Sequence, residues 1–141
     1  MNLYKELKSK HQKEVSEFPM AFAFSNQQFK AGMEKLGLTE SDTDKVCSIG
    51  AGGFIRKQDS EALKDMRIRH SRELQEAIDN DQTGDAFIFD MFNHELANHE
   101  YSYTRDVKPT LDALGFTPEE INANPKIQHG LYKAIQNQHD E

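Results

Sequence analysis

The chain has 141 residues, of which 36% are hydrophobic and 29% charged, and its formal net charge is −7. This length is usual for one domain, so we expect a single globular domain over residues 1–141. The lone cysteine, Cys47, excludes an intrachain disulfide and cysteine-rich zinc sites. No apolar run approaches the length of a membrane span, and the first residues lack the apolar region of a signal peptide. We therefore expect a cytoplasmic protein with no membrane partner.

The first half of the chain predicts two helices and a small sheet. Apolar residues at three- and four-residue steps predict an amphipathic helix over residues 3–18. A second helix is expected to begin at Ser25, which has the capping-box spacing to Gln28, and to end at Gly37. The glycine-rich stretch 50–53 predicts a hairpin loop between two short strands. The three predicted strands are residues 20–24, 45–49 and 54–57.

The second half of the chain is predicted to be helical. A cap at Asp59 or Ser60 opens a helix to about Asn80, and a polar loop separates it from an aromatic helix over residues 85–103. Proline and glycine signals mark three shorter helices, which begin near residues 108, 118 and 125. The prediction is an α+β fold, mostly helical, with about six helices and a two- or three-stranded antiparallel sheet. The aromatic helix is expected to pass through the centre.

The aromatic helix carries the candidate catalytic residues. His94 and His99 are five residues apart, so on a helix they diverge by about 140° and cannot form the H-E-x-x-H zinc site. Glu95 and His99 are four residues apart and can share one metal ion or one proton. Two ligands are too few for a divalent transition metal, so His94, or His11 and His70 from other helices, would have to complete the site. This pattern defines one alternative function, a metal-assisted hydrolase.

A structural interpretation of His99 competes with the catalytic one. The residue continues an apolar stripe whose other members are Phe89, Phe92, Leu96 and Tyr103. A histidine in such a stripe usually packs in the core and forms a hydrogen bond with a neighbour. We therefore expect the ring to point inward, with Glu95 as a candidate partner, and we expect no cofactor.

One basic cluster is a candidate nucleic-acid surface. Its lysines and arginines alternate with carboxylates, which is typical of a solvated, ion-paired face. Binding of nucleic acid through residues 56–72 is a second alternative, although no recognised nucleic-acid motif accompanies the cluster. The basic residues are Arg56, Lys57, Lys64, Arg67, Arg69 and Arg72.

Three stretches, residues 18–29, 53–57 and 96–101, resemble an uncharacterised family of small acidic proteins from phages, mobile elements and gut Gram-positive bacteria. The resemblance covers nearly the whole chain. It implies no activity and no site residues, and it suggests an accessory role in a phage or mobile element. Residues 81–106 carry six acids against Arg105 alone. We therefore favour a non-enzymatic protein that binds a protein partner, with an acidic surface within residues 81–141.

Overall fold

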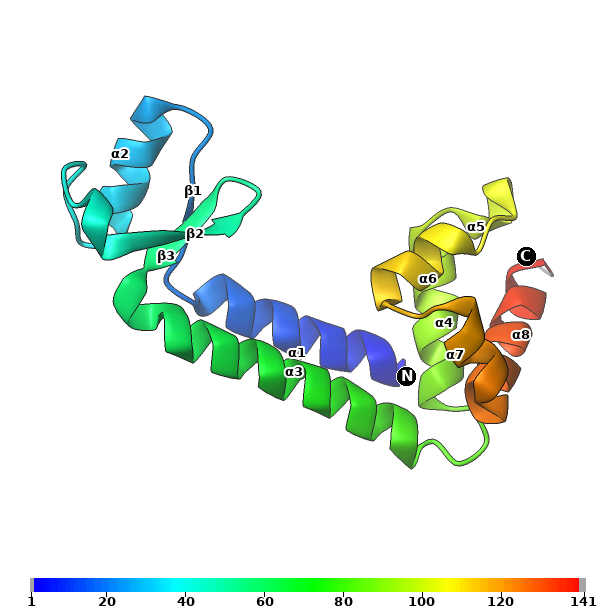
Figure 1. Ribbon diagram of the computed structural model, residues 1–141. Helices are drawn as coiled ribbons and strands as arrows, with labels where there is room; N and C mark the ends of the chain where they lie inside the picture. Colours follow the sequence, from blue (N-terminus) through cyan, green and yellow to red (C-terminus); the bar gives the residue numbers. More distant parts are fainter. Residues whose placement is uncertain (1, 140–141) are drawn as a thin grey trace. The chain divides into compact units, whose positions relative to one another are not determined.

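A computed structural model describes residues 2–139, and the chain is mostly α-helical (Figure 1). The described part contains eight α-helices and one three-stranded antiparallel sheet. The predicted α+β class is therefore confirmed, and the helices number eight rather than about six. The elements are α1 (Leu3–Glu17), β1 (Ala21–Phe22), α2 (Asn26–Lys35), β2 (Val46–Gly50), β3 (Gly53–Arg56), α3 (Ser60–Asn80), α4 (Phe87–Asn98), α5 (Tyr101–Thr104), α6 (Lys108–Leu114), α7 (Pro118–Ala123) and α8 (Pro125–His139), with short 3-10 turns at Thr43–Lys45 and Lys57–Asp59.

The chain divides into two compact units. The sheet unit comprises residues 13–71, and the helical unit comprises residues 1–12 together with 72–141. Helices α1 and α3 each contribute residues to both units. None of the helices within residues 2–139 is both long and apolar enough to cross a membrane. The expected single domain over residues 1–141 stays a prediction.

The sheet unit places a helix on each face of its sheet. The strand order is β1-β3-β2, and both neighbouring pairs are antiparallel. Because successive residues of a strand face opposite sides, Phe54 of β3 packs with Met33 of α2, whereas Ile55 packs with Leu63 of α3. Helix α2 can approach closely because it carries Gly32, where a Cβ would lie 2.7 Å from Cζ of Phe54. The first half of α3 covers the other face (Figure 1).

The local signals predicted in the sheet unit are confirmed. The Ser25 hydroxyl accepts a hydrogen bond from the backbone N–H of Gln28 at 3.2 Å and caps α2. The side-chain oxygen of Gln28 accepts in turn from the backbone N–H of Phe24 at 2.7 Å. Residues 50–53 form the hairpin turn between β2 and β3, where Gly50 and Gly52 have φ of 90° and 78°. Glycine adopts these values without steric cost, which is why the turn forms here.

Helix α4 passes through the core of the helical unit, as predicted, and packs closely against α8. Two glycines allow this approach. A Cβ on Gly130 would lie 2.4 Å from Cγ2 of Ile88 and 2.8 Å from the carbonyl oxygen of Gly84. The side chains of α4 that are completely buried are Ile88, Met91, Phe92 and Leu96.

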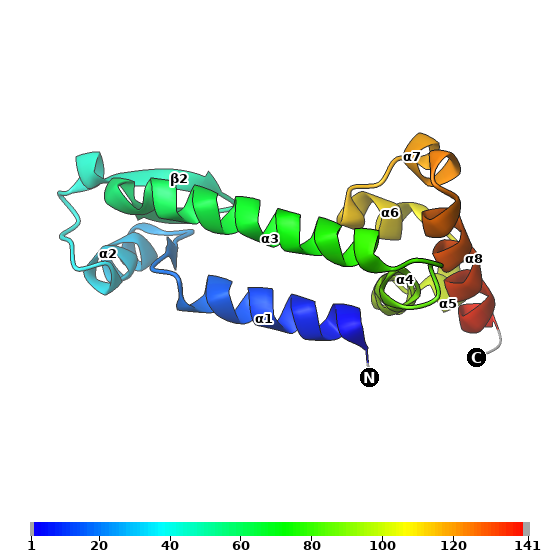
Figure 2. The same ribbon diagram turned by 90° about the horizontal axis from the view of Figure 1, so that it is seen from below.

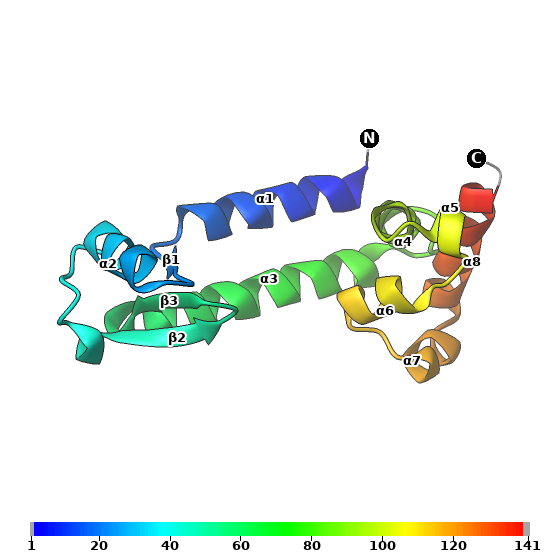
Figure 3. The ribbon, with the colours of Figure 1, turned by 90° about the horizontal axis from the view of Figure 1, so that it is seen from above.

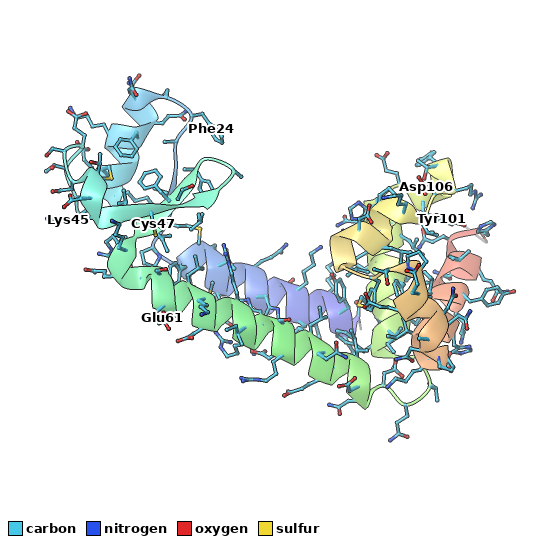
Figure 4. All side chains as sticks on the ribbon, in the orientation of Figure 1. Phe24, Lys45, Cys47, Glu61, Tyr101 and Asp106 are labelled. Atoms are coloured by element: carbon cyan, nitrogen blue, oxygen red, sulfur yellow. The ribbon has the colours of Figure 1, made fainter. Side chains whose placement is uncertain are left out.

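The prediction of one continuous helix over residues 85–103 is wrong. Glu100 has φ of 58°, in the left-handed region, and separates α4 from the short helix α5. This break turns Tyr101, labelled in Figure 4, into the core, where its hydroxyl lies 3.0 Å from Nε2 of His139. Tyr103, expected on the buried stripe, is 88% exposed. The apolar stripe therefore ends with α4.

Figure 2 shows the loop that leads from α3 into α4. The carboxylate of Asp81 organises this loop. Asp81 is 5% exposed and accepts four backbone N–H groups at 2.8–3.2 Å. Burial alone would raise the pKa of Asp81, but the four N–H groups outweigh it and hold the pKa below its ordinary value. Asp81 thus provides the start of α4 with the acceptor that its N-cap residue, Ala86, lacks. The donors are Thr83, Gly84, Ala86 and Ile88.

Candidate functional site

Glu95 is a buried carboxylate in the helical unit, and residues from α1 surround it. The Nζ of Lys8 donates to its Oε1 at 2.9 Å, and the side-chain amide of Asn98 donates to the same oxygen at 3.3 Å. The Nε2 of His94 lies 3.7 Å from that oxygen. Glu95 as a residue is only 5% exposed. The carboxylate is therefore engaged in an ion pair and hydrogen bonds that tie α1 to α4.

Tyr4 completes the surroundings of Glu95. Its ring lies 5.6 Å from the ring of His94 and 5.9 Å from that of Phe87. Burial raises the pKa of the Tyr4 phenol, and the negative charge of Glu95 together with a hydrogen bond to it raises that pKa further. The phenol therefore stays protonated at physiological pH and donates its hydrogen to the carboxylate.

The candidate histidines pair with different carboxylates. In the helical unit, Nε2 of His11 lies 3.4 Å from Oε2 of Glu73. In the sheet unit, Nε2 of His70 lies 3.4 Å from Oε2 of Glu14. His99 is the partly exposed C-cap of α4, and its backbone N–H donates to the carbonyl of residue 95.

No metal site is visible among the described residues. Within residues 2–139, no three histidine, cysteine, aspartate or glutamate side chains are placed so that they could hold a metal ion. The neighbours of Glu95 are an ammonium, a phenol, an amide and one imidazole. Metal-assisted hydrolysis through Glu95 and His99 stays a prediction.

The basic cluster divides into paired and exposed cations. Arg56 donates to Asp59 at 2.8 Å, Arg69 pairs with Glu14, and Arg72 lies 3.9 Å from Glu76. Three of the candidate nucleic-acid residues are thus engaged by neighbouring carboxylates, which is typical of an ion-paired face. The remaining cations, which are exposed and form no ion pair with another described residue, are Lys57, Lys64 and Arg67.

A hollow of about 490 Å³ lies in the helical unit between the first turns of α1 and the last turns of α3. Figures 2 and 3 show these turns side by side. Residues at the start of α4 also line the hollow. Its apolar floor includes Leu3, which is 43% exposed. The other apolar lining residues are Leu7, Ala77, Ala86 and Phe87, and the polar ones are Glu73, Glu76, Asn80 and Asp81.

Sequence reasoning missed this hollow because two helices distant in the chain form it. The only local signal was the pair Leu3 and Leu7, one helical turn apart near the start of α1. The partners of Glu95 were missed for the same reason. Lys8 is 87 residues away from Glu95, and its position one turn after Tyr4 gave no indication of a carboxylate.

The whole net charge belongs to the helical unit. The sheet unit, residues 13–71, contains nine lysines and arginines and nine aspartates and glutamates. The helical unit therefore has the formal charge of −7. The carboxylates at the end of α3 belong to this unit as well, and the acidic surface within residues 81–141 stays a prediction.

Among curated proteins and solved structures, nothing matches the chain. One family model matches residues 3–137, which is nearly the full length, and its description is "Family of unknown function (DUF7659)". The chain therefore belongs to this family of unknown function.

Proposed function

We propose that this protein is a non-enzymatic binding protein whose helical unit binds a basic, amphipathic segment of a partner protein. The observation that carries the proposal is the hollow between α1 and α3, which combines an apolar floor with carboxylates. A partner's leucine or phenylalanine side chains would remove Leu3 and its apolar neighbours from water. An accessory role in a phage or mobile element remains part of the proposal and depends on the sequence resemblance. A cytoplasmic location remains part of it as an expectation from the sequence.

Electrostatics favours a basic partner for this hollow. A unit with charge −7 attracts a cationic segment and speeds its association. Glu76 lines the hollow, and its side chain is 64% exposed. Its neighbour Arg72 is 3.9 Å away and similarly exposed, and such surface pairs contribute little. A lysine or arginine of a partner can therefore take the place of Arg72 at Glu76.

Burial of Glu95 supports binding rather than acid–base catalysis. The carboxylate is engaged by Lys8 and Asn98, and it is not among the residues that line the hollow. Catalysis by this group would need a substrate within hydrogen-bond reach of it. The hollow instead offers apolar surface and carboxylates, which suit recognition of a partner.

The proposal is tested with two fluorescein-labelled amphipathic helical peptides that share a leucine stripe. One carries lysines on its polar face and the other carries glutamates. We expect fluorescence anisotropy to show binding of the lysine peptide to the full chain and no binding of the glutamate peptide. The double variant Leu3→Ser/Glu76→Lys should weaken binding by about tenfold or more, since it removes apolar surface and reverses one charge.

The matched control is Glu119→Lys, an exposed residue of α7 with the same change of charge. It should weaken binding of the lysine peptide by less than about threefold, because charge at a distance from the hollow acts weakly at physiological salt. Equal loss in both variants would mean unspecific attraction by the acidic unit, and it would refute a site between α1 and α3. Absence of lysine-peptide binding to the wild type would also refute it. Circular dichroism checks that each variant is folded.

A further inference from the structure

β2 is an edge strand of the sheet. In the order β1-β3-β2, its one strand neighbour within residues 2–139 is β3. The outer side of an edge strand presents backbone N–H and C=O groups to which another strand can bind. Extended segments of partner proteins commonly use such edges by adding a strand.

A hollow of about 370 Å³ adjoins this strand, between the first half of α3 and the sheet face formed by β2 and Ile55 of β3. Cys47, labelled in Figure 4, and Ile49 line it from β2, while Leu63 and Ile68 line it from α3. Ile68 is 54% exposed, so part of its apolar surface is open to a partner. The views in Figures 1 and 3 agree that β2 and this part of α3 are neighbours. The edge strand therefore adjoins an apolar surface that a partner's side chains can cover.

Two cations lie along the same hollow. Lys64 and Arg67 line it, both are exposed, and neither forms an ion pair with another described residue. Arg69, two residues later on the same helix, is instead paired with Glu14. The sheet unit has no net charge, and the charged residues that line this hollow are these two cations, whereas the nearby acids Glu61 and Asp65 do not line it.

We infer that the outer edge of β2 binds an extended, acidic segment of a partner protein as a fourth strand of the sheet. Side chains of an added strand alternate between the two faces. One set would lie over α3, where apolar residues fit against Ile49 and Ile68 and carboxylates pair with Lys64 and Arg67. The inference is independent of the hollow between α1 and α3, because no residue lines both.

Nucleic acid fits this surface less well than an acidic peptide. Binding of a phosphate backbone needs clustered cations, whereas Glu61 and Asp65 alternate with the cations on this part of α3. Three of the six candidate basic residues are already engaged by carboxylates. The hollow is lined mainly by apolar side chains, which phosphates do not cover.

Selection from a displayed library of random octapeptides tests the inference. The library is selected on the full chain and then depleted on the variant Lys64→Glu/Arg67→Glu. We expect the enriched peptides to alternate apolar with acidic residues. A synthetic peptide of enriched sequence should bind the variant at least about tenfold more weakly than the wild type. The control Lys13→Glu/Lys30→Glu, which has the same change of charge at exposed positions of the sheet unit, should stay within about threefold.

Three further measurements separate strand addition from simple charge attraction. Two versions of the peptide are methylated on the backbone nitrogens of alternate residues, one at the odd positions and one at the even positions. One version should lose binding and the other should keep it, because only every second N–H group faces β2. Ile68→Ser should weaken binding by about threefold or more without changing charge. NMR amide shifts should change in residues 46–50 and 60–68.

Several results would overturn the inference. If the selection enriches basic peptides, or enriches no peptide, the inference that the partner segment is acidic is wrong. Equal tolerance of both methylated peptides would contradict strand addition. Tighter binding of single-stranded or duplex DNA, lost in Lys64→Glu/Arg67→Glu, would identify a nucleic-acid site instead. Self-association through β2, detected by sedimentation and not reversed by peptide, would identify a second copy of the chain as the occupant.

Discussion

The Nζ of Lys8 lies 2.9 Å from Oε1 of Glu95, although 87 residues separate the two in the chain. The side chain of Glu95 is 6% exposed and that of Lys8 is 28% exposed. The same ammonium lies 5.9 Å from the centroid of the Tyr4 ring. Glu95 thus holds α1 against α4 together with Asp90, whose Oδ2 accepts from the backbone N–H of Leu3 at 3.0 Å. The first turns of α1 form one wall of the hollow in the helical unit.

Replacing Lys8 by methionine should destabilise the protein. The substitution leaves the buried carboxylate of Glu95 without its cation, and removing one partner of a buried pair is costly. Because Lys8 is partly exposed, we expect a loss of about 2 kcal/mol in the free energy of unfolding, measured in urea. The matched control is Lys5→Met on the exposed side of α1, which should change stability by less than about 0.5 kcal/mol.

The double variant Lys8→Met/Glu95→Gln shows whether the charge of the carboxylate causes this loss. Burying a neutral amide without a cation costs less free energy than burying a carboxylate. The double variant should therefore lose less free energy of unfolding than the sum of the losses of the two single variants. Additive losses would contradict a direct interaction between these side chains.

Local signals in the sequence predicted the sheet unit well. The capping pair Ser25 and Gln28 and the glycine-rich turn at residues 50–53 act over a few residues, and the structure contains both. Alternation along β3 fixes which residues face each helix, so Phe54 and Ile55 belong to opposite cores. Such features are predictable because the chain's immediate neighbourhood determines them.

The break after α4 was not predictable in this way. Glu100 takes a left-handed conformation without being glycine or asparagine, so no local residue signal marks it. Tertiary contacts maintain the break instead, since Tyr101 is buried and contacts His139 of α8. The start of α4 likewise depends on Asp81, which lies five residues before the N-cap.

The cationic partner of Glu95 could not be predicted from the sequence, because it comes from another helix of the fold. The sequence identified Glu95 as a candidate because His99 is one turn away, yet its cation comes from α1. Helical periodicity predicts which residues share a face of one helix, but it gives no indication of which helix packs there. The sequence also could not predict that Lys64 and Arg67 are exposed and form no ion pair with another described residue, because it does not show which cations form ion pairs.

Asp81→Asn should destabilise the helical unit. An amide offers one acceptor oxygen in place of two, so two of the four backbone N–H groups lose their acceptor. We expect a loss of about 2 kcal/mol at neutral pH from the free energy of unfolding in urea. Asp79→Asn, on the exposed last turn of α3, is the matched control and should have little effect.

The effect of Asp81→Asn should depend on pH. The folded pKa of Asp81 lies below its ordinary value of 3.8, so the carboxylate stabilises the fold above that value. This contribution is lost as the pH falls below 3.8 through the folded pKa. The difference in stability between wild type and variant should therefore shrink in acid. A difference that grows below pH 3.8 would contradict the assigned role.

Gly130→Ala should destabilise the contact between α4 and α8. The new methyl group would overlap Ile88 and the carbonyl oxygen of Gly84, so the helices must separate. We expect a net loss of about 1–3 kcal/mol, even though alanine favours the helix more than glycine does. The control is Gln128→Ala at an exposed position of α8, and a thermal unfolding midpoint for each variant checks the prediction. Stabilisation by Gly130→Ala would show that the two helices are not in close contact.

Glu14 should remain ionised in acid that protonates an ordinary glutamate. Its pKa is lowered from 4.5 to about 2, mainly by the hydrogen bond with Arg69 and further by the one with His70. Burial raises the pKa, but by less than the Arg69 hydrogen bond lowers it. Carbon-13 NMR of the side-chain carboxyl at a pH of about 4 should therefore show a carboxylate in the wild type. In Arg69→Gln the group should be mostly protonated at that pH, because the hydrogen bond that lowers its pKa most is lost.

The control for this titration is Arg67→Gln, which removes an exposed arginine of the same helix that forms no ion pair with another described residue. It should leave Glu14 ionised at a pH of about 4, since Arg69 is retained. The pKa of Glu14 is lower in the folded protein than its ordinary value of 4.5. The interaction therefore stabilises the fold above pH 4.5, and this stabilisation is lost as the pH falls toward about 2. Protonation of Glu14 to the same extent in both variants would mean that the arginines of α3 act on the carboxyl group in a general way, and not through the specific contact of Arg69.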